Sequence, residues 1–214
     1  MFIANRMTQH PVTVSPDATL GDAINLVKKY KFARLPVVED GKLVGLVSEK
    51  ELMRHAPSPA TTLSRYEVRE LLDKLAVRDI MQTDFITISD EATIEEAALL
   101  MATNHIGGLP VLSAVGKLVG VITEADIFRT FVDVMGLAEG KTRLTIATPD
   151  KIGVVNEISG VFTENGLSID SMVTCKQPNG QYEIVMRGDI PDVETIKAQI
   201  EAKGYKVIHT VKIG

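Results

Sequence analysis

Two short motifs in this chain place a hydroxyl group and a carboxylate three residues apart, directly after a run of apolar residues. They are Thr123 with Asp126, and Ser48 with Glu51. A carboxylate accepts hydrogen bonds from both hydroxyls of a ribose, and the neighbouring hydroxyl supports a phosphate or the ribose edge. The same spacing also forms the capping box that begins many helices. Spacing alone therefore favours a helix cap over a ribose site.

Both motifs belong to an internal repeat. Residues 7–40 align with residues 81–114, and residues 41–54 align with residues 116–129 after one inserted residue. The longest identical run is Gly-Lys-Leu-Val-Gly, at 41–45 and again at 116–120. Leu-Pro-Val recurs at 35–37 and 109–111. Identities at this many spaced positions indicate a duplication.

Each copy predicts a β-α-β-β-α unit. In the first copy we expect a strand over 12–14, a helix begun by the capping box of Thr19 and Asp22, strands over 35–37 and 43–47, and a last helix after Ser48. In the second copy the strands are expected over 85–88, 109–111 and 118–122, with a capping box at Thr93 and Glu96. One unit buries too little apolar surface to be stable alone. The two should therefore pack as a pseudo-twofold pair.

Each repeat resembles a CBS motif, and two in tandem resemble a CBS pair, over residues 1 to about 132. In that family a nucleotide site is shared across the repeats. The adenine lies against the segment before Leu-Pro-Val of one copy, and the acid comes from the other copy. The resemblance implies a nucleotide site formed by Thr13, Phe32, Ala33, Arg34, Pro36, Thr123, Asp126 and Arg129. It implies a second, weaker site formed by Ser48, Glu51, Thr87, Ile106, Gly107, Gly108 and Pro110.

Three of these residues keep alternative interpretations. Glu51 departs from the aspartate usual in the family, and its longer side chain would enter the ribose space. Phe32 can pack on a purine or in the core. Arg129, like its equivalent Arg54, either meets a phosphate or lies on a solvated helix face.

Between the repeats, residues 56–60 are expected to form a loop, and Ser64 with Glu67 forms another capping box. The helix that follows has apolar residues at helical spacing, and it is expected to cover the core or contact a second copy.

Residues 142–213 predict β-α-β-β-α-β, a ferredoxin-like order, so the fold class is α/β of the α+β type. Strands are expected over 143–147, 167–175, 182–187 and 207–213, with helices after residue 153 and over 193–202. This segment resembles an ACT domain, which implies sensing of an amino acid or small metabolite. The resemblance places the effector at Asp150, Ile152 and Gly153, where backbone N–H groups at a helix start would receive a carboxylate. Gly140-Lys141-Thr142 looks like the end of a phosphate-binding loop, but its spacing is one residue short and a strand follows.

The predicted organisation is a CBS pair over 1–134, a linker over 135–141 and an ACT domain over 142–214. The pair comprises repeats 7–54 and 81–129 with a helical insert over 55–80. This order and length are similar to the acetoin-utilization B protein group of bacteria, which implies an accessory or regulatory role in acetoin catabolism.

Composition argues against several classes of function. A net charge of −5 and 5% aromatic residues do not suit nucleic-acid binding. No apolar stretch is long enough to span a membrane. The single cysteine, Cys175, fits a reducing compartment, so a cytoplasmic location is expected. The four histidines, His10, His55, His105 and His209, lack metal-ligand spacing.

The sequence therefore predicts a homodimeric regulator rather than an enzyme, with no required cofactor. AMP, ADP, ATP or adenosylmethionine is the expected ligand, and a metabolic enzyme is a candidate partner. A ligand-free oligomerisation scaffold for such an enzyme is the first alternative. A small enzyme acting on acetoin or a nucleotide is the second, although the sequence shows no cluster of reactive side chains.

Overall fold

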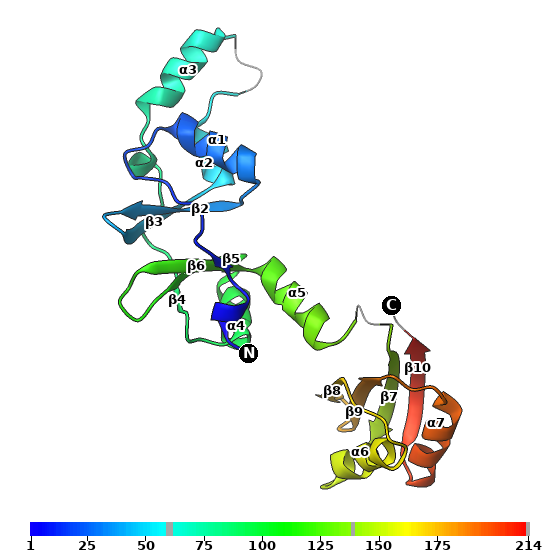
Figure 1. Cartoon of the computed structure of the whole chain (residues 1–214). Helices are drawn as coiled ribbons and strands as arrows, with labels where there is room; N and C mark the ends of the chain where they lie inside the picture. The colour runs from blue at the N-terminus through cyan, green and yellow to red at the C-terminus, as the bar shows by residue number, and fades with distance from the viewer. Residues whose placement is uncertain (59–61, 138–139, 213–214) are drawn as a thin grey trace. The chain divides into compact units, whose positions relative to one another are not determined.

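The computed structural model describes residues 1–58, 62–137 and 140–212. The chain divides into two compact units, Met1–Ile127 and Phe128–Gly214 (Figure 1). Each unit has its own buried hydrophobic residues. The mixed helices and strands of both units confirm the predicted α+β class. The loop predicted over 56–60, the linker over 135–141 and the strand over 207–213 lie partly outside the described residues.

Each repeat contains a helix, a β-hairpin and a second helix. The elements of the first repeat are α1 (Leu20–Tyr30), β2 (Arg34–Glu39), β3 (Lys42–Ser48) and α2 (Glu49–His55). Their equivalents in the second repeat are α4 (Ile94–Asn104), β5 (Gly108–Leu112), β6 (Leu118–Thr123) and α5 (Glu124–Val134). These helices and hairpins lie where the sequence predicted them.

Local signals set both ends of α1 and α4. Thr19 and Thr93 each form a reciprocal capping box with the acid three residues further on. At the other end, Lys31 and His105 adopt the left-handed conformation, with φ of 56° and 55°. A side chain at positive φ cannot continue a right-handed helix, so both helices end at equivalent residues.

The leading strand of each repeat is shorter than predicted. Instead of a strand over 12–14, Val14 alone bridges Val37 in parallel, and the strand expected over 85–88 is β4 (Ile88–Ser89). The Val14 N–H donates to the Pro36 carbonyl at 3.0 Å, and the Val38 N–H donates to the Val14 carbonyl at 2.9 Å. The next bond of a parallel ladder would need an N–H group from residue 36, and proline has none. Pro110 is the equivalent residue beside β4, so the same limit applies there.

The first residues of each repeat pair with the hairpin of the other repeat. β1 (Thr8–Gln9) pairs antiparallel with β6, which completes the sheet order β1-β6-β5-β4. Gln82, the second residue of the second repeat, exchanges two backbone hydrogen bonds with Leu46 of β3, at 2.8 and 2.9 Å. The two repeats are thus joined by reciprocal pairing.

The same exchange is seen in the hydrophobic cores. Two short 3-10 helices, η1 (Ile3–Asn5) and η2 (Val77–Asp79), precede the repeats. Ile3 is buried in the cluster of the second repeat, and Val77 is buried in that of the first. Residues 1–9 and 76–82 therefore belong structurally to the opposite repeat.

The insert forms α3 (Arg65–Lys74), which begins at the predicted capping box of Ser64 and Glu67. Leu72 and Leu75 pack against the first repeat's cluster, whereas Tyr66 and Leu71 are exposed. One side of α3 thus covers the core, as predicted.

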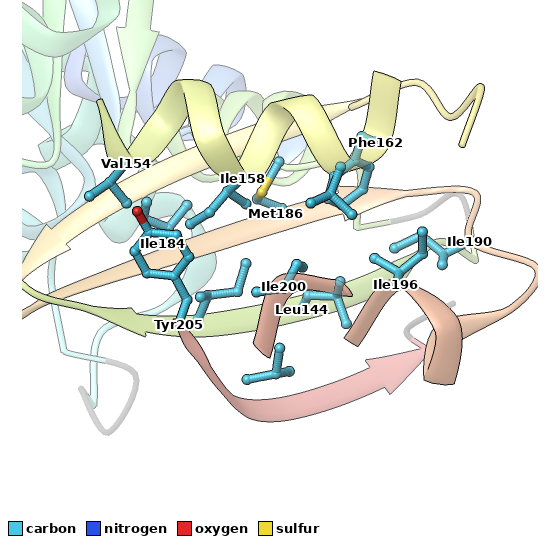
Figure 2. Close-up of a cluster of buried hydrophobic side chains, with 13 residues drawn as sticks. Leu144, Val154, Ile158, Phe162, Ile184, Met186, Ile190, Ile196, Ile200 and Tyr205 are labelled. Atoms are coloured by element: carbon cyan, nitrogen blue, oxygen red, sulfur yellow. The ribbon is translucent and has the colours of Figure 1, made fainter. Parts of the chain in front are cut away.

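The C-terminal unit has the predicted ferredoxin-like topology. Its strands and helices are β7 (Thr142–Thr148), α6 (Val154–Glu164), β8 (Ser171–Lys176), β9 (Tyr182–Gly188), α7 (Val193–Ala202) and β10 (Lys206–Lys212). The antiparallel sheet has the order β10-β7-β9-β8. Alternate residues of the central strands pack with α6 and α7 around Phe162, which is fully buried (Figure 2).

Candidate functional site

A cavity of about 470 Å³ lies between the two repeats, and both hairpins contribute to its wall. Nine residues predicted for the two nucleotide sites line it. They are Phe32, Ala33, Arg34, Pro36 and Thr123 of the first predicted site, and Ser48, Gly107, Gly108 and Pro110 of the second. Residues assigned to two sites thus surround one continuous space.

The other predicted residues lie outside the wall of this cavity. They are Thr13, Asp126 and Arg129 of the first set, and Glu51, Thr87 and Ile106 of the second. Both acids are therefore set back from the space, and each lies one hydrogen bond behind a hydroxyl residue that lines it.

Asp126 caps the helix that follows β6. The Thr123 hydroxyl donates to Asp126 Oδ2 at 2.6 Å, and the Thr123 N–H donates to the same oxygen at 2.9 Å. In return, the Asp126 N–H reaches Thr123 Oγ1 at 3.4 Å. Asp126 is 7% exposed. The Asp126 carboxylate is thus held in position by the hydroxyl of Thr123, the residue of this pair that lines the cavity.

Glu51 forms the equivalent cap and has a further partner. Its Oε2 accepts hydrogen bonds from the Ser48 N–H and hydroxyl, both at 2.9 Å. Its Oε1 accepts a hydrogen bond from Gln82 Nε2 at 2.5 Å. Both oxygens of Glu51 are therefore bonded within the protein. Gln82 was not among the predicted site residues, although it aligns with Thr8 within the repeat.

Arg34, the first residue of β2, and Phe32, two residues before it, both line the cavity. Arg34 Nη1 donates to the carbonyl of Gly108, its equivalent in the second repeat, at 3.4 Å. Phe32 packs partly on the first repeat's cluster and stacks on Tyr30, with ring centroids 5.4 Å apart. The ring of Phe32 contacts the core and also lines the cavity, and its packing on a purine stays a prediction.

The cavity also includes residues that the sequence analysis did not identify. They are Thr8, Pro11, Val12, Leu46, Glu49, Lys50, Leu109 and Val121. Thr8 belongs to the exchanged N-terminal segment, and Leu46, Leu109 and Val121 lie on strands of the two hairpins. Glu49 and Lys50 lie between the predicted site residues Ser48 and Glu51. Their position inside this motif could have indicated that they line the site.

The predicted effector residues of the C-terminal unit form an exposed loop before α6. Gly153 is at the N-cap with φ of 93°, and Ile152 is 99% exposed. Glu157, in the first turn of α6, accepts hydrogen bonds from Tyr205 at 2.6 Å and Lys151 at 3.1 Å. The bond from Tyr205 lowers the pKa of Glu157, and the same bond raises the pKa of Tyr205 to about 12. A carboxylate of the protein thus already lies at this helix start.

A second cavity, of about 650 Å³, lies beside this loop. Pro149, Tyr182, Glu183 and Lys206 are among its lining residues, whereas Asp150, Ile152 and Gly153 are not. The effector role of the loop stays a prediction.

Within residues 1–58, 62–137 and 140–212, no group of three or more His, Cys, Asp or Glu side chains is arranged to hold a metal ion. In the same described parts, no helix is both long and apolar enough to cross a membrane.

Comparison with known proteins identifies the repeats. The family model described as the CBS domain matches residues 3–58 and 77–133, which is more than half of the chain. The chain belongs to the CBS domain family. The ACT domain model matches residues 142–204, so the CBS pair is followed by an ACT domain, and both predicted resemblances are confirmed. Both CBS matches include the exchanged segments around Ile3 and Val77.

Three similar proteins illustrate this relationship. The chain is 32% identical to a CBS domain-containing protein of Dictyostelium discoideum, over 63% of this chain and 94% of that protein. The structure of AcuB from Vibrio cholerae, a protein assigned to acetoin utilization, is 29% identical with a TM-score of 0.54, over 65% of this chain and 96% of that chain. The structure of CBSX2 from Arabidopsis thaliana in complex with AMP is 28% identical with a TM-score of 0.52, over 62% of this chain and 97% of that chain.

Proposed function

We propose that the CBS pair binds AMP, or a related adenine nucleotide, in the cavity between its repeats, and that the chain acts as a ligand-sensing regulator. The cavity carries this proposal. Its volume of about 470 Å³ is in the range of small-molecule sites. Its wall combines one aromatic ring, three prolines, three hydroxyl side chains and two cationic side chains. The AMP complex of CBSX2 supports AMP as the first ligand to test.

Each part of a nucleotide has a matching group in the wall. Phe32 presents an aromatic ring on which the adenine base can stack. Thr123, backed by Asp126, offers an acceptor for ribose hydroxyls. Arg34 and Lys50 supply positive charge for a phosphate. We propose that one nucleotide binds with its ribose at Thr123 and Asp126, because Thr123 lines the cavity and Asp126 is bonded to it.

Calorimetric titration of the full chain with AMP, ADP, ATP and adenosylmethionine tests this proposal. Saturable heat with AMP is expected. Asp126→Asn should weaken AMP binding by about tenfold or more, because a hydrogen bond to a charged group contributes about 1.5–3 kcal/mol. Asp22→Asn is the matched control, since Asp22 caps α1 in the same way but does not line or back the cavity.

Two outcomes would contradict the proposal. If no adenine ligand gives heat while the oligomer stays intact, the chain is a scaffold whose cavity is not a nucleotide site. If Asp126→Asn and Asp22→Asn both bind AMP like the wild type, Asp126 is a helix cap alone.

We also propose that the chain forms homodimers. Three large apolar side chains, Tyr66, Leu71 and Leu99, are 88%, 47% and 69% exposed on α3 and α4 and are candidate contacts. Sedimentation velocity should give twice the mass of one chain, and a monomer at micromolar concentration would contradict this.

The likeness to AcuB supports a place for this sensor in acetoin utilization. Growth on acetoin should be impaired in a strain that lacks the protein, and normal growth would remove that support.

A further inference from the structure

Two arginines lie opposite each other on the C-terminal sheet. Leu144 of β7 and Met186 of β9 point into the core with α6 and α7 (Figure 2). Neighbouring side chains of a strand point to opposite faces. Arg143 and Arg187 therefore lie on the face away from that core. They are direct register partners on adjacent strands.

Arg187 is buried without compensation. It is 5% exposed, and its Nε and Nη1 atoms have no hydrogen-bond partner among the described residues. Buried charges in proteins are normally paired and hydrogen-bonded. Burial lowers the pKa of Arg187, and the positive charge of Arg143 lowers it further.

The neighbouring groups on this face do not supply the missing negative charge. Arg143 Nη1 donates to Thr145 Oγ1 at 2.7 Å and lies 3.3 Å from His209 Nδ1. Neither arginine forms an ion pair with a carboxylate of the described residues. Glu183, on the same face of β9, is four residues from Arg187, which is about 13 Å along a strand.

We propose that Arg187 and Arg143 form a binding site for an oxyanion group, carboxylate or phosphate, of a small molecule. Two parallel N–H groups of a guanidinium match two oxygens of either group. An oxyanion between the arginines would accept from the unpaired Nε and Nη1 atoms of Arg187. It would also offset the repulsion of two like charges directly opposite in a sheet. A water molecule can accept a hydrogen bond but cannot offset that charge.

This site is separate from the nucleotide cavity, because it lies in the unit 128–214 and shares no residue with the cavity wall. It also differs from the loop of Asp150, Ile152 and Gly153. AMP binding and oxyanion binding can therefore be measured independently on the same variants.

Thermal unfolding of the full chain with sodium phosphate, acetate or succinate tests the proposal, against sodium chloride at matched ionic strength. At least one oxyanion should raise the melting temperature saturably beyond chloride. Arg187→Met should abolish this rise, and Arg143→Gln should weaken oxyanion binding by about tenfold or more, as truncating one charged partner does. Arg69→Gln, on exposed α3, is the control and should respond like the wild type.

Arg187→Met should retain its response to AMP, which separates loss of the oxyanion site from misfolding. Arg143→Gln tests the same site if Arg187→Met does not fold. Equal responses of the wild type and both site variants, or no oxyanion effect beyond chloride, would overturn the proposal. A fall in oligomer mass on Arg187→Met without any oxyanion response would also overturn it, because the face would then be an interface between copies.

Discussion

At the scale of single residues, Asp126 and Glu51 occupy equivalent positions in the two repeats. Each closes a capping box, so the motif Ser/Thr-x-x-acid acts structurally in both repeats. Glu51 also accepts a hydrogen bond from Gln82 through its second oxygen, because its longer side chain reaches the exchanged segment. The proposed ribose contact at Asp126 would use a carboxylate that the helix cap already holds in position.

Phe32 provides a prediction at this scale. Phe32→Leu preserves packing on the core but removes the ring that lines the cavity. AMP binding should weaken by about tenfold, because stacking on an aromatic side chain contributes about 1–3 kcal/mol per base. Calorimetry on the full chain measures the change. Ile106→Leu is the control, since Ile106 is the equivalent residue outside the wall, and its affinity should match the wild type. Unchanged affinity in Phe32→Leu would assign that ring to the core alone.

At the scale of elements, the exchanged segments depend on glycines in the hairpins. Met7 packs over Gly120 of β6, and Met81 packs over Gly45 of β3. A Cβ atom at residue 45 would lie 2.7 Å from the Met81 sulfur, and one at residue 120 would overlap Met7. These glycines are conserved between the copies of the repeat because the opposite segment approaches their backbone.

Gly120→Ala should lower the free energy of unfolding by about 1–3 kcal/mol, as overpacking does. In the double variant with Met7→Ala, the loss should be smaller than the sum of the single losses by at least about 0.5 kcal/mol. Urea unfolding measures each value. Gly160→Ala with Met7→Ala is the control pair and should be additive, because no atom lies within 4 Å of a Cβ at residue 160. Additivity in the Gly120 pair would contradict the contact.

At the scale of the whole molecule, the CBS pair and the ACT domain have separate cores. The clusters of the pair contain residues up to Ile127, and the ACT cluster begins at Leu144. The unfolding of one unit therefore need not remove the contacts that hold the other.

Phe162→Ala tests this separation, because Phe162 is fully buried in the ACT core. Truncation of a buried phenylalanine costs about 3–5 kcal/mol, so hydrogen exchange over 142–212 should accelerate. Exchange over 1–127 and the affinity for AMP should stay at their wild-type values. Loss of protection across both units would show instead that they unfold together.

The sequence by itself determined the repeat, the helices, the hairpins and the ACT topology. These features depend on signals within a few residues, such as the capping boxes of Thr19 and Thr93 and the apolar periodicity. It also indicated nine of the residues that line the cavity, because the CBS resemblance relates positions in one repeat to positions in the other.

Only the tertiary structure decided the exchange of segments 1–9 and 76–82, the bond from Gln82 to Glu51 and the unpaired burial of Arg187. These features depend on contacts between residues far apart in the chain, which local periodicity does not encode. The short leading strands depend both on a local sequence signal and on a tertiary contact. The missing N–H group of Pro36 is visible in the sequence, but it limits a strand only because Val14 is placed beside it.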